Sequence, residues 1–346
     1  MKFDVVVGNP PYNEDTIGKS TNPPSIYHKF MDMAYQITDK ALLITPARFL
    51  FNAGGTNEKW NKKMLNDKHF KVLFFEQKSS NVFPDTDIKG GVAISYRDAN
   101  KDFGAIEYFT AFEELNSIRE KVVNNPKFKN IMSIINVQNK FDLKVLFEDY
   151  PEYKNIIGSN GKDKRLRQII MERLPEIFTE EKINEDSYRI IGLINKKRSY
   201  RYVPKKYIED NGIINKYKVL VPSANGSGAI GEVLSTPLIG EPLIGEPLIG
   251  FTQTFISFGG YDNYDEAENT LKYIKTKFCR TLLGILKVTQ GNNKSTWACV
   301  PLQDFTNNSD IDWSKSIPEI DQQLYKKYNL SDKEINFIEE KVKAME

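Results

Sequence analysis

The sequence predicts an α/β fold in its first 110 residues, followed by an α+β region. Three observations carry this prediction: short apolar runs end at Gly or Pro, helical stretches alternate with them, and aromatic strands with basic clusters replace this pattern later. Alternating strands and helices are typical of a parallel or mixed sheet that is covered by helices. The 346 residues are enough for two domains.

The first unit alternates strands and helices. Apolar, β-branched runs bounded by turn residues predict strands, and apolar residues at helical spacing predict helices. We expect strands at 3–7, 41–45, 71–76 and 91–96, and helices at 26–37 and 60–65. The first two strands, joined by a crossover helix, are expected to run parallel.

The second region opens with a helix and continues with shorter aromatic strands. A helix is expected at 111–123, with a connector to about residue 140. The clearest strands are expected at 217–222 and 251–258. One long amphipathic helix is expected at 265–286, because its apolar residues recur at helical spacing on one face.

Composition and charge are those of an ordinary globular protein. Lys and Arg total 48 against 46 for Asp and Glu, so the net charge of +2 gives by itself no sign of a nucleic-acid partner. Two Cys and two His residues are too few and too scattered to predict a zinc site or a catalytic triad. No stretch of about 18 apolar residues and no signal peptide is found, so we expect a cytoplasmic protein.

Basic residues nevertheless gather at 162–167 and at 196–206. In the second cluster Lys196, Lys197, Arg198 and Arg201 are interleaved with tyrosines, a mixture that suits contacts to phosphates. The alternative, a solvated face beside a half-buried aromatic strand, fits the pattern equally well.

Three copies of Pro-Leu-Ile-Gly, separated by single Glu residues, occupy 237–250. The period of five matches neither a helix nor a strand, and the proline of each unit removes a backbone donor. We therefore expect an extended surface loop or arm. Because each unit is encoded in frame, copy-number slippage would change only the loop length, either to vary recognition or as a harmless expansion.

The most informative feature is the turn Asn9-Pro10-Pro11-Tyr12, which follows the first strand and Gly8. The chain leaves the sheet here at the carboxyl edge, where open α/β sheets bind ligands. An amide oxygen, a proline carbonyl and an aromatic face suit a flipped adenine, whose amine needs acceptors and whose ring stacks. The alternative interpretation is a proline-rich turn after a buried strand.

This stretch resembles motif IV of the gamma-type adenine-N6 DNA methyltransferases, which use S-adenosyl-L-methionine and turn the base out of double-stranded DNA. The resemblance implies that Asn9, Pro10 and Tyr12 are catalytic and that Pro11 belongs to the substrate-binding turn. The following elements resemble the second half of a Rossmann-like methyltransferase sheet, in which a Phe precedes the last strand. Phe83 occupies that link and is expected to cover the other face of the adenine.

The carboxyl-terminal part resembles the target-recognition region of type IIG restriction-modification methylases, through the phrases at 301–305 and 310–313. The implied organisation is a partial catalytic domain at 1–110, a helical connector at 111–140 and a DNA-binding, target-recognition domain at 141–346 that includes the 237–250 loop. The four basic residues at 196–201 are then expected to bind DNA, and a nuclease is a possible partner.

The sequence departs from this family in one respect. The family places an acidic residue and a Gly-x-Gly loop for S-adenosyl-L-methionine before the catalytic turn, and here only Met1 and Lys2 precede Phe3. Glycines at 54–55 and 226–228 do not lie between a strand and a helix with an acidic residue downstream. We therefore expect that the cofactor half is absent, that either a separate chain or a lost upstream segment supplies it, and that the first strand exposes an apolar edge.

Two alternatives to a site-specific DNA adenine methyltransferase stay open. One is a non-enzymatic DNA-recognition subunit or pseudo-methyltransferase, which would not need the cofactor loop. The other is a methyltransferase of RNA or protein, which shares the catalytic turn but does not need the long carboxyl-terminal region.

Overall fold

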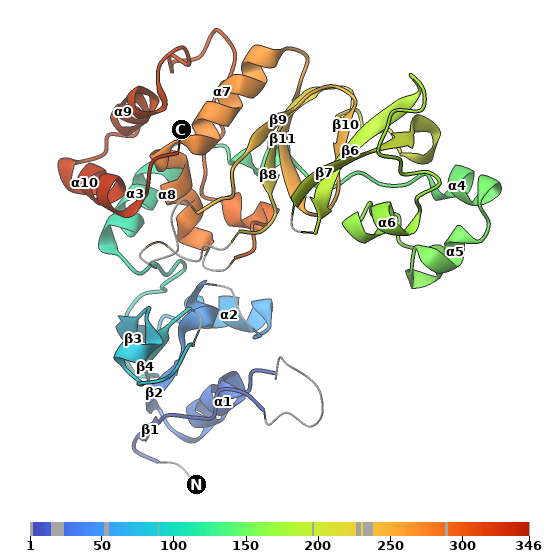
Figure 1. Ribbon diagram of the computed structural model, residues 1–346. Helices are drawn as coiled ribbons and strands as arrows, with labels where there is room; N and C mark the ends of the chain where they lie inside the picture. Colours follow the sequence, from blue (N-terminus) through green and yellow to red (C-terminus); the bar gives the residue numbers. More distant parts are fainter. Residues whose placement is uncertain are drawn as a thin grey trace.

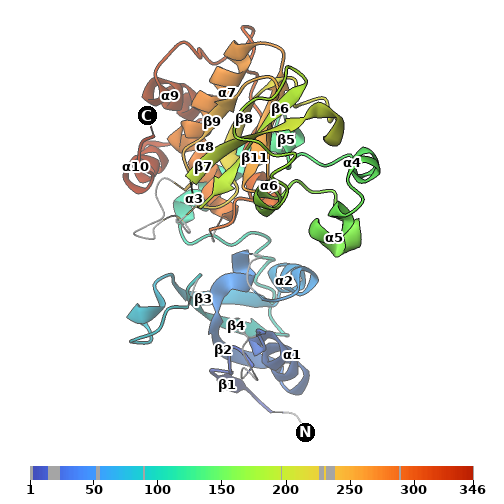
Figure 2. The same cartoon turned by 45° about the vertical axis from the view of Figure 1, so that its right-hand side comes forward.

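The computed structural model describes residues 3–14, 24–51, 55–88, 90–195, 197–225, 230, 238–287 and 290–345. Figures 1 and 2 show two parts: a small amino-terminal unit that contains β1 to β4, and a larger part that contains the remaining labelled elements. The chain passes from one to the other just before α3 (Glu113–Val123).

The amino-terminal unit is a four-stranded mixed sheet in the order β1-β2-β4-β3. β1 runs parallel to β2, and β4 runs antiparallel to both of its neighbours. The elements are β1 (Val6–Gly8), α1 (Tyr27–Ile37), β2 (Lys40–Pro46), α2 (Glu58–Leu65), β3 (Phe70–Glu76) and β4 (Val92–Asp98). Each predicted element is therefore confirmed, although the first strand begins three residues later and Phe3 makes only an isolated bridge to Thr38.

The sheet is covered unequally. Met31 of α1, Leu43 of β2 and Met64 of α2 are buried in one shared core. The strand residues of opposite parity, such as Leu42 and Ile44, are only half-buried. At the β1 edge, Phe3, Val5 and Val7 are 50%, 51% and 67% exposed, so the predicted exposure of an apolar first strand is confirmed.

The larger part contains two further sheets. One has the order β5-β11-β8-β9 and the other β10-β6-β7. Their strands are β5 (Ile135–Asn136), β6 (Ser187–Ile194), β7 (Lys197–Pro204), β8 (Tyr217–Pro222), β9 (Leu243–Gly245), β10 (Ile249–Phe251) and β11 (Phe255–Tyr261). The helices after α3 are α4 (Leu143–Asp149), α5 (Tyr153–Ile156), α6 (Gln168–Arg173), α7 (Tyr264–Lys275), α8 (Lys277–Leu286), α9 (Ile317–Lys327) and α10 (Asp332–Lys341).

The helix α3 is part of the core of the larger part. Its residues Leu115, Ile118 and Val122 are buried in one cluster with side chains of β8, β11 and α7 to α10. A second core forms around α4 to α6, β6 and β7. The domain limits near residues 110 and 140 stay predictions.

The prediction of a single long helix at 265–286 is wrong. α7 and α8 are separate helices that meet at Thr276. The backbone of Thr276 is extended, with φ −59° and ψ 147°, and its hydroxyl accepts from the N–H of Cys279. The buried Asp321 carboxylate accepts from the N–H groups of Lys277 and Phe278 at 3.0 and 2.8 Å. These caps begin a new helix, because they satisfy backbone donors that would otherwise lack partners.

The predicted strand at 251–258 is also divided. Phe251 ends β10, which pairs with β6, whereas Phe255 begins β11, which pairs with β8. A turn at 252–254 lies between them, closed by the N–H of Phe255 and the carbonyl of Thr252 at 3.1 Å. The chain thus crosses from one sheet to the other, which a continuous apolar run does not reveal.

The repeat at 237–250 is not a surface arm, which corrects the prediction. Its residues from 238 on are described, and Pro237 lies outside the described residues. Leu238 and Ile239 are 0% and 1% exposed, and the second and third units form β9 and β10. A proline fits because each strand is only three residues long, so the Glu-Pro pair falls in the connection rather than in a ladder.

Cys279 and Cys299 are buried free thiols. None of the helices in the described ranges combines the length and apolarity needed to span a membrane.

Candidate active site

The predicted catalytic turn lies at the carboxyl end of β1. Val6 and Tyr12, on either side of the turn, pack against the core beneath α1, while Asn9 and Pro11 are exposed. The carbonyl of Tyr12 accepts from the N–H of Ile26 at 3.0 Å, one residue before α1. Both ends of the turn are thus fixed, and the Asn9 side chain is presented to solvent between them.

Tyr12 and Asn9 are neighbours. Burial raises the pKa of the Tyr12 phenol, and the adjacent Asn9 side chain partly opposes this rise. The Tyr12 hydroxyl is buried, and among the described residues it makes no hydrogen bond of normal geometry. The ring is held by packing against the core, and its hydroxyl lies beside the Asn9 side chain.

The registers place three chain connections at one edge of this sheet. Gly8 is opposite Leu43 in β2, so β1 and β2 both end at this edge. Pro46, the last residue of β2, is opposite Val92, which is also opposite Glu76 at the end of β3. The Asn9 turn, the segment after β2 and the link from β3 to β4 therefore leave the sheet on the same side, as expected for a ligand-binding edge.

The link from β3 to β4 carries Phe83, which is half-buried. The buried Ser79 holds this link closed: its hydroxyl donates to the Thr86 carbonyl at 3.1 Å and accepts from the N–H of Ile88 at 2.8 Å. The N–H of Phe83 donates to the Ser79 carbonyl at 2.8 Å. Phe83 is thus positioned at the same edge as Tyr12, but their facing as two walls of one pocket stays a prediction.

The link ends in two glycines that sequence reasoning did not assign to the site. Gly90 and Gly91 have φ of 83° and 80°, a conformation that side chains disfavour. A Cβ at Gly91 would lie 2.3 Å from the Glu76 carbonyl oxygen. The Gly-Gly pair was the available signal for this close turn, whereas nothing in the sequence distinguished Ser79.

Three of the predicted DNA-binding residues, Lys197, Arg198 and Arg201, lie on β7 in the larger part of the molecule (Figure 1). Lys197 and Arg198 are exposed, and the Arg198 guanidinium donates to the Glu241 carbonyl of the repeat. Arg201 is less accessible and pairs with Glu180 at 2.7 Å. Lys196 lies outside the described residues. The assignment of these four residues to DNA stays a prediction.

The other basic cluster is partly neutralised by ion pairs. Arg165 and Arg167 both approach Asp163, at 2.8 and 3.5 Å, and these arginines lower the pKa of its carboxyl to about 2. Lys164 pairs with Glu209 at 2.6 Å. Phosphate binding here would have to compete with these ion pairs.

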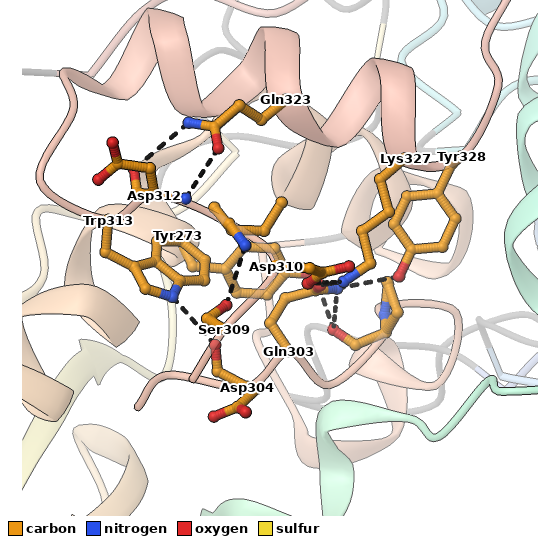
Figure 3. A network of polar contacts seen from close by, with 12 residues as sticks. Tyr273, Gln303, Asp304, Ser309, Asp310, Asp312, Trp313, Gln323, Lys327 and Tyr328 are labelled. Carbon is orange, nitrogen blue, oxygen red and sulfur yellow. Dashed lines mark hydrogen bonds and ion pairs between the residues drawn. The ribbon is translucent and has the colours of Figure 1, made fainter. Parts of the chain in front are cut away.

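The two carboxyl-terminal phrases meet in space, as Figure 3 shows. The Trp313 indole donates to the Asp304 carbonyl at 3.0 Å, and Lys327 of α9 contacts both Gln303 and Asp310, at 2.8 and 2.6 Å. A hollow of about 560 Å³ opens beside this network. These contacts attach the loop that carries the two phrases to α9.

Comparison with known proteins gives a family match for the amino-terminal unit. Residues 1–83 match the model of the Eco57I restriction-modification methylase family. The matched stretch contains both the Asn9 turn and Phe83. The rest of the chain lies outside this match.

One curated relative is an uncharacterized adenine-specific methylase of Mycoplasma pneumoniae (strain ATCC 29342 / M129 / Subtype 1). It is 33% identical over 95 residues, which are 27% of this chain and 22% of the relative. Among solved structures, the type IIG restriction endonuclease BpuSI is similar with 13% identity and a TM-score of 0.36, over 97% of this chain and 52% of that one. The chain thus spans about a fifth of the curated relative and half of BpuSI.

Proposed function

We propose that this chain carries the adenine-binding turn of a site-specific DNA adenine-N6 methyltransferase of a restriction-modification system. One observation carries the proposal. The turn with the exposed Asn9 and the half-buried Tyr12 and the link that contains Phe83 lie at the same edge of the sheet, and both belong to the stretch that matches a methylase family. The adenine-specific methylase relative supports the choice of base.

The proposed role of these residues is to position the adenine amine for methyl transfer. The adenine amine is a poor nucleophile because its lone pair is delocalised into the ring. The Asn9 amide oxygen and the Pro10 carbonyl would accept its two hydrogens, which favours a tetrahedral nitrogen and orients its lone pair. Tyr12 and Phe83 would hold the base by stacking and so offset part of the cost of unstacking it from DNA.

S-adenosyl-L-methionine would supply the methyl group, but the described residues do not fit this cofactor. No described strand runs into a helix through an acidic residue and Gly-x-Gly, and β1 itself runs into two prolines. We infer that residues outside the described ranges complete the cofactor site. The exposed apolar side chains of Phe3, Val5 and Val7 at the unpaired side of β1 support this inference.

The decisive experiment measures N6-methyladenine in genomic DNA. The gene, together with its chromosomal neighbours, is expressed in a host without adenine methylation, and modified sites are mapped by single-molecule sequencing. We expect methylation at one sequence motif and its loss, by about 100-fold, in Asn9→Ala, by analogy with the loss of one hydrogen-bonding group that stabilises a transition state.

Asn13→Ala is the matched control. Asn13 is also an exposed amide near the turn, its amide oxygen accepts from the Ser25 hydroxyl at 3.5 Å, and its substitution should leave methylation unchanged. Full methylation in Asn9→Ala would refute the catalytic assignment. No methylation with the native gene set would favour a DNA-recognition subunit.

A further inference from the structure

The three identical units of the repeat occupy three different environments. The first places Leu238 and Ile239 in the core beside α8, the second forms β9 on β8, and the third forms β10 on β6. The units thus connect one sheet to the other, although their sequences are the same. Nothing in a unit itself specifies which of the three places it fills.

The glycine of each unit shows that all three places are closely packed. A Cβ added at Gly240 would lie 2.9 Å from Pro222 Cγ, and one at Gly245 would lie 3.1 Å from Leu220 Cδ1. A Cβ at Gly250 would lie 2.6 Å from Ile190 Cδ1. A unit that moved into a neighbouring place would bring the required glycine with it.

The second and third places hold a unit more firmly than the first. Residues 243–245 pair with β8, and the buried Lys218 ammonium donates to the Glu246 carbonyl at 3.3 Å. The third unit pairs with β6, and the N–H of Phe251 donates to the Asn139 side chain at 2.9 Å. Residues 238–240 belong to no described strand and are held by side-chain burial.

We propose that the repeat is a register-exchangeable segment, in which the in-frame loss of one unit re-threads the remaining units through β9 and β10 and leaves the first place without a repeat unit. The change is therefore not one of loop length. In a two-unit chain the residue before the β9 unit is Thr236 instead of Glu241. The ion pair of Glu241 with Lys275, at 2.7 Å, is lost beside Arg198 of the basic strand.

Two consequences follow. Stability falls, because Leu238 and Ile239 leave the core beside α8 and the residues that follow in register put Ser235 at the position of Gly240, where a Cβ would lie 2.9 Å from Pro222 Cγ. If the proposed DNA function holds, affinity for DNA rises, because a carboxylate is removed beside Arg198 on β7. The number of units would then adjust DNA binding without altering β9 or β10.

The test compares chains with two, three and four units, made by deleting or duplicating residues 242–246. We expect the melting temperature of the two-unit chain to fall by roughly 5–10 °C. The four-unit chain should melt within about 2 °C of the native chain, because each of the three places still holds a complete unit. Equal destabilisation of both variants would overturn the proposal, even if the two-unit chain did not fold.

An alanine substitution shows which of the three places a unit occupies. In the native chain Ile239→Ala should lower the melting temperature more than Ile244→Ala, since Ile239 is buried and Ile244 is half-buried. In the two-unit chain Ile239 occupies the place of Ile244, so Ile239→Ala should cost no more than Ile244→Ala does natively. Retention of the full cost would show that the first unit stays in place, and would refute re-threading.

DNA binding is measured separately, with a random-sequence duplex at several salt concentrations. A two-unit chain with tighter binding and a steeper salt dependence supports the link to recognition. Binding equal to that of the native chain contradicts this link. If no chain binds DNA, the proposed function fails, while the melting and alanine measurements still decide whether the units exchange.

Discussion

At the scale of single residues, the candidate site depends on how Tyr12 is held. Its ring packs against the core beneath α1, its carbonyl is bonded to the N–H of Ile26, and its hydroxyl lies beside Asn9. Because the hydroxyl has no hydrogen bond of normal geometry among the described residues, the ring itself is the part that the proposed stacking requires.

If Tyr12 stacks on the base, two substitutions of Tyr12 should have different effects on methylation. Tyr12→Phe retains the ring and should keep methylation within about threefold of the native level. Tyr12→Ala and Phe83→Ala should each lower kcat/KM by roughly 5- to 150-fold, the equivalent of about 1–3 kcal/mol of stacking on one base. Methylation kinetics on duplex DNA with the completed enzyme provide the measurement.

Phe75→Leu is a control for the loss of an aromatic ring from this unit. Phe75 is half-buried and packs edge-on against Phe51 and Phe109 within the unit, so its replacement should affect stability more than kcat/KM. Equal kinetic effects of all four substitutions would show that Tyr12 and Phe83 act only through folding.

At the scale of elements, a helix or strand was predicted correctly where the residues that determine it are close to it in the sequence. The amino-terminal strands and helices are local, periodic and bounded by turn residues, so pattern alone located them. The break at Thr276 escaped prediction because Asp321, which caps α8, is 45 residues further along the chain. The repeat was misassigned because its period gave no sign of pairing with β8 and β6, which also lie elsewhere in the sequence.

The same distinction applies to the candidate site. Asn9 and Tyr12 were recognisable because they belong to one tetrapeptide. Phe83 was recognisable because it lies in a short link between two predicted strands. Ser79 was not recognisable, because its role depends on hydrogen bonds across seven and nine residues of an irregular link.

The turn between β9 and β10 yields a prediction about backbone strain. Glu246-Pro247-Leu248-Ile249 is closed by a 3.2 Å hydrogen bond, and Leu248 has φ 68° at the position where such turns favour Gly. Leu248 is 41% exposed, so Leu248→Gly should change the free energy of unfolding by no more than about 1 kcal/mol, with relief of strain offsetting lost contacts.

Leu238→Gly is the matched comparison, because Leu238 also has a positive φ, of 74°, but is fully buried. It should cost about 2–5 kcal/mol, since the lost core contacts outweigh any relief of strain. Urea unfolding of both variants measures the difference. Similar losses in the two would mean that the Leu248 side chain is needed for the turn.

At the scale of the whole molecule, the β1 edge bears on how the enzyme is completed. If a second polypeptide pairs with this edge, charged residues there should prevent assembly, because unpaired edges are blocked by lysine. Val5→Lys combined with Val7→Lys should abolish genomic methylation. Met33→Lys, at a residue of α1 that is 59% exposed, should retain it. Methylation by the double variant at the native level would exclude pairing at this edge.

The basic strand β7 lies in the larger part of the molecule, away from the Asn9 turn, and yields the last prediction. If its side chains contact phosphates, replacing Lys196, Lys197 and Arg198 together by Ala should weaken binding to all duplexes alike and reduce the dependence of log K on log salt by about 2 to 3. A change of preferred sequence would mean instead that these residues contact base edges.

Lys164→Ala is the matched control for these substitutions. Lys164 is an exposed lysine of the other basic cluster and already pairs with Glu209 at 2.6 Å, so its loss should alter neither affinity nor salt dependence. Fluorescence anisotropy with labelled duplexes, across a series of salt concentrations, measures both quantities. If the triple variant behaves like Lys164→Ala, β7 is a solvated face, and DNA must contact another surface of the larger part.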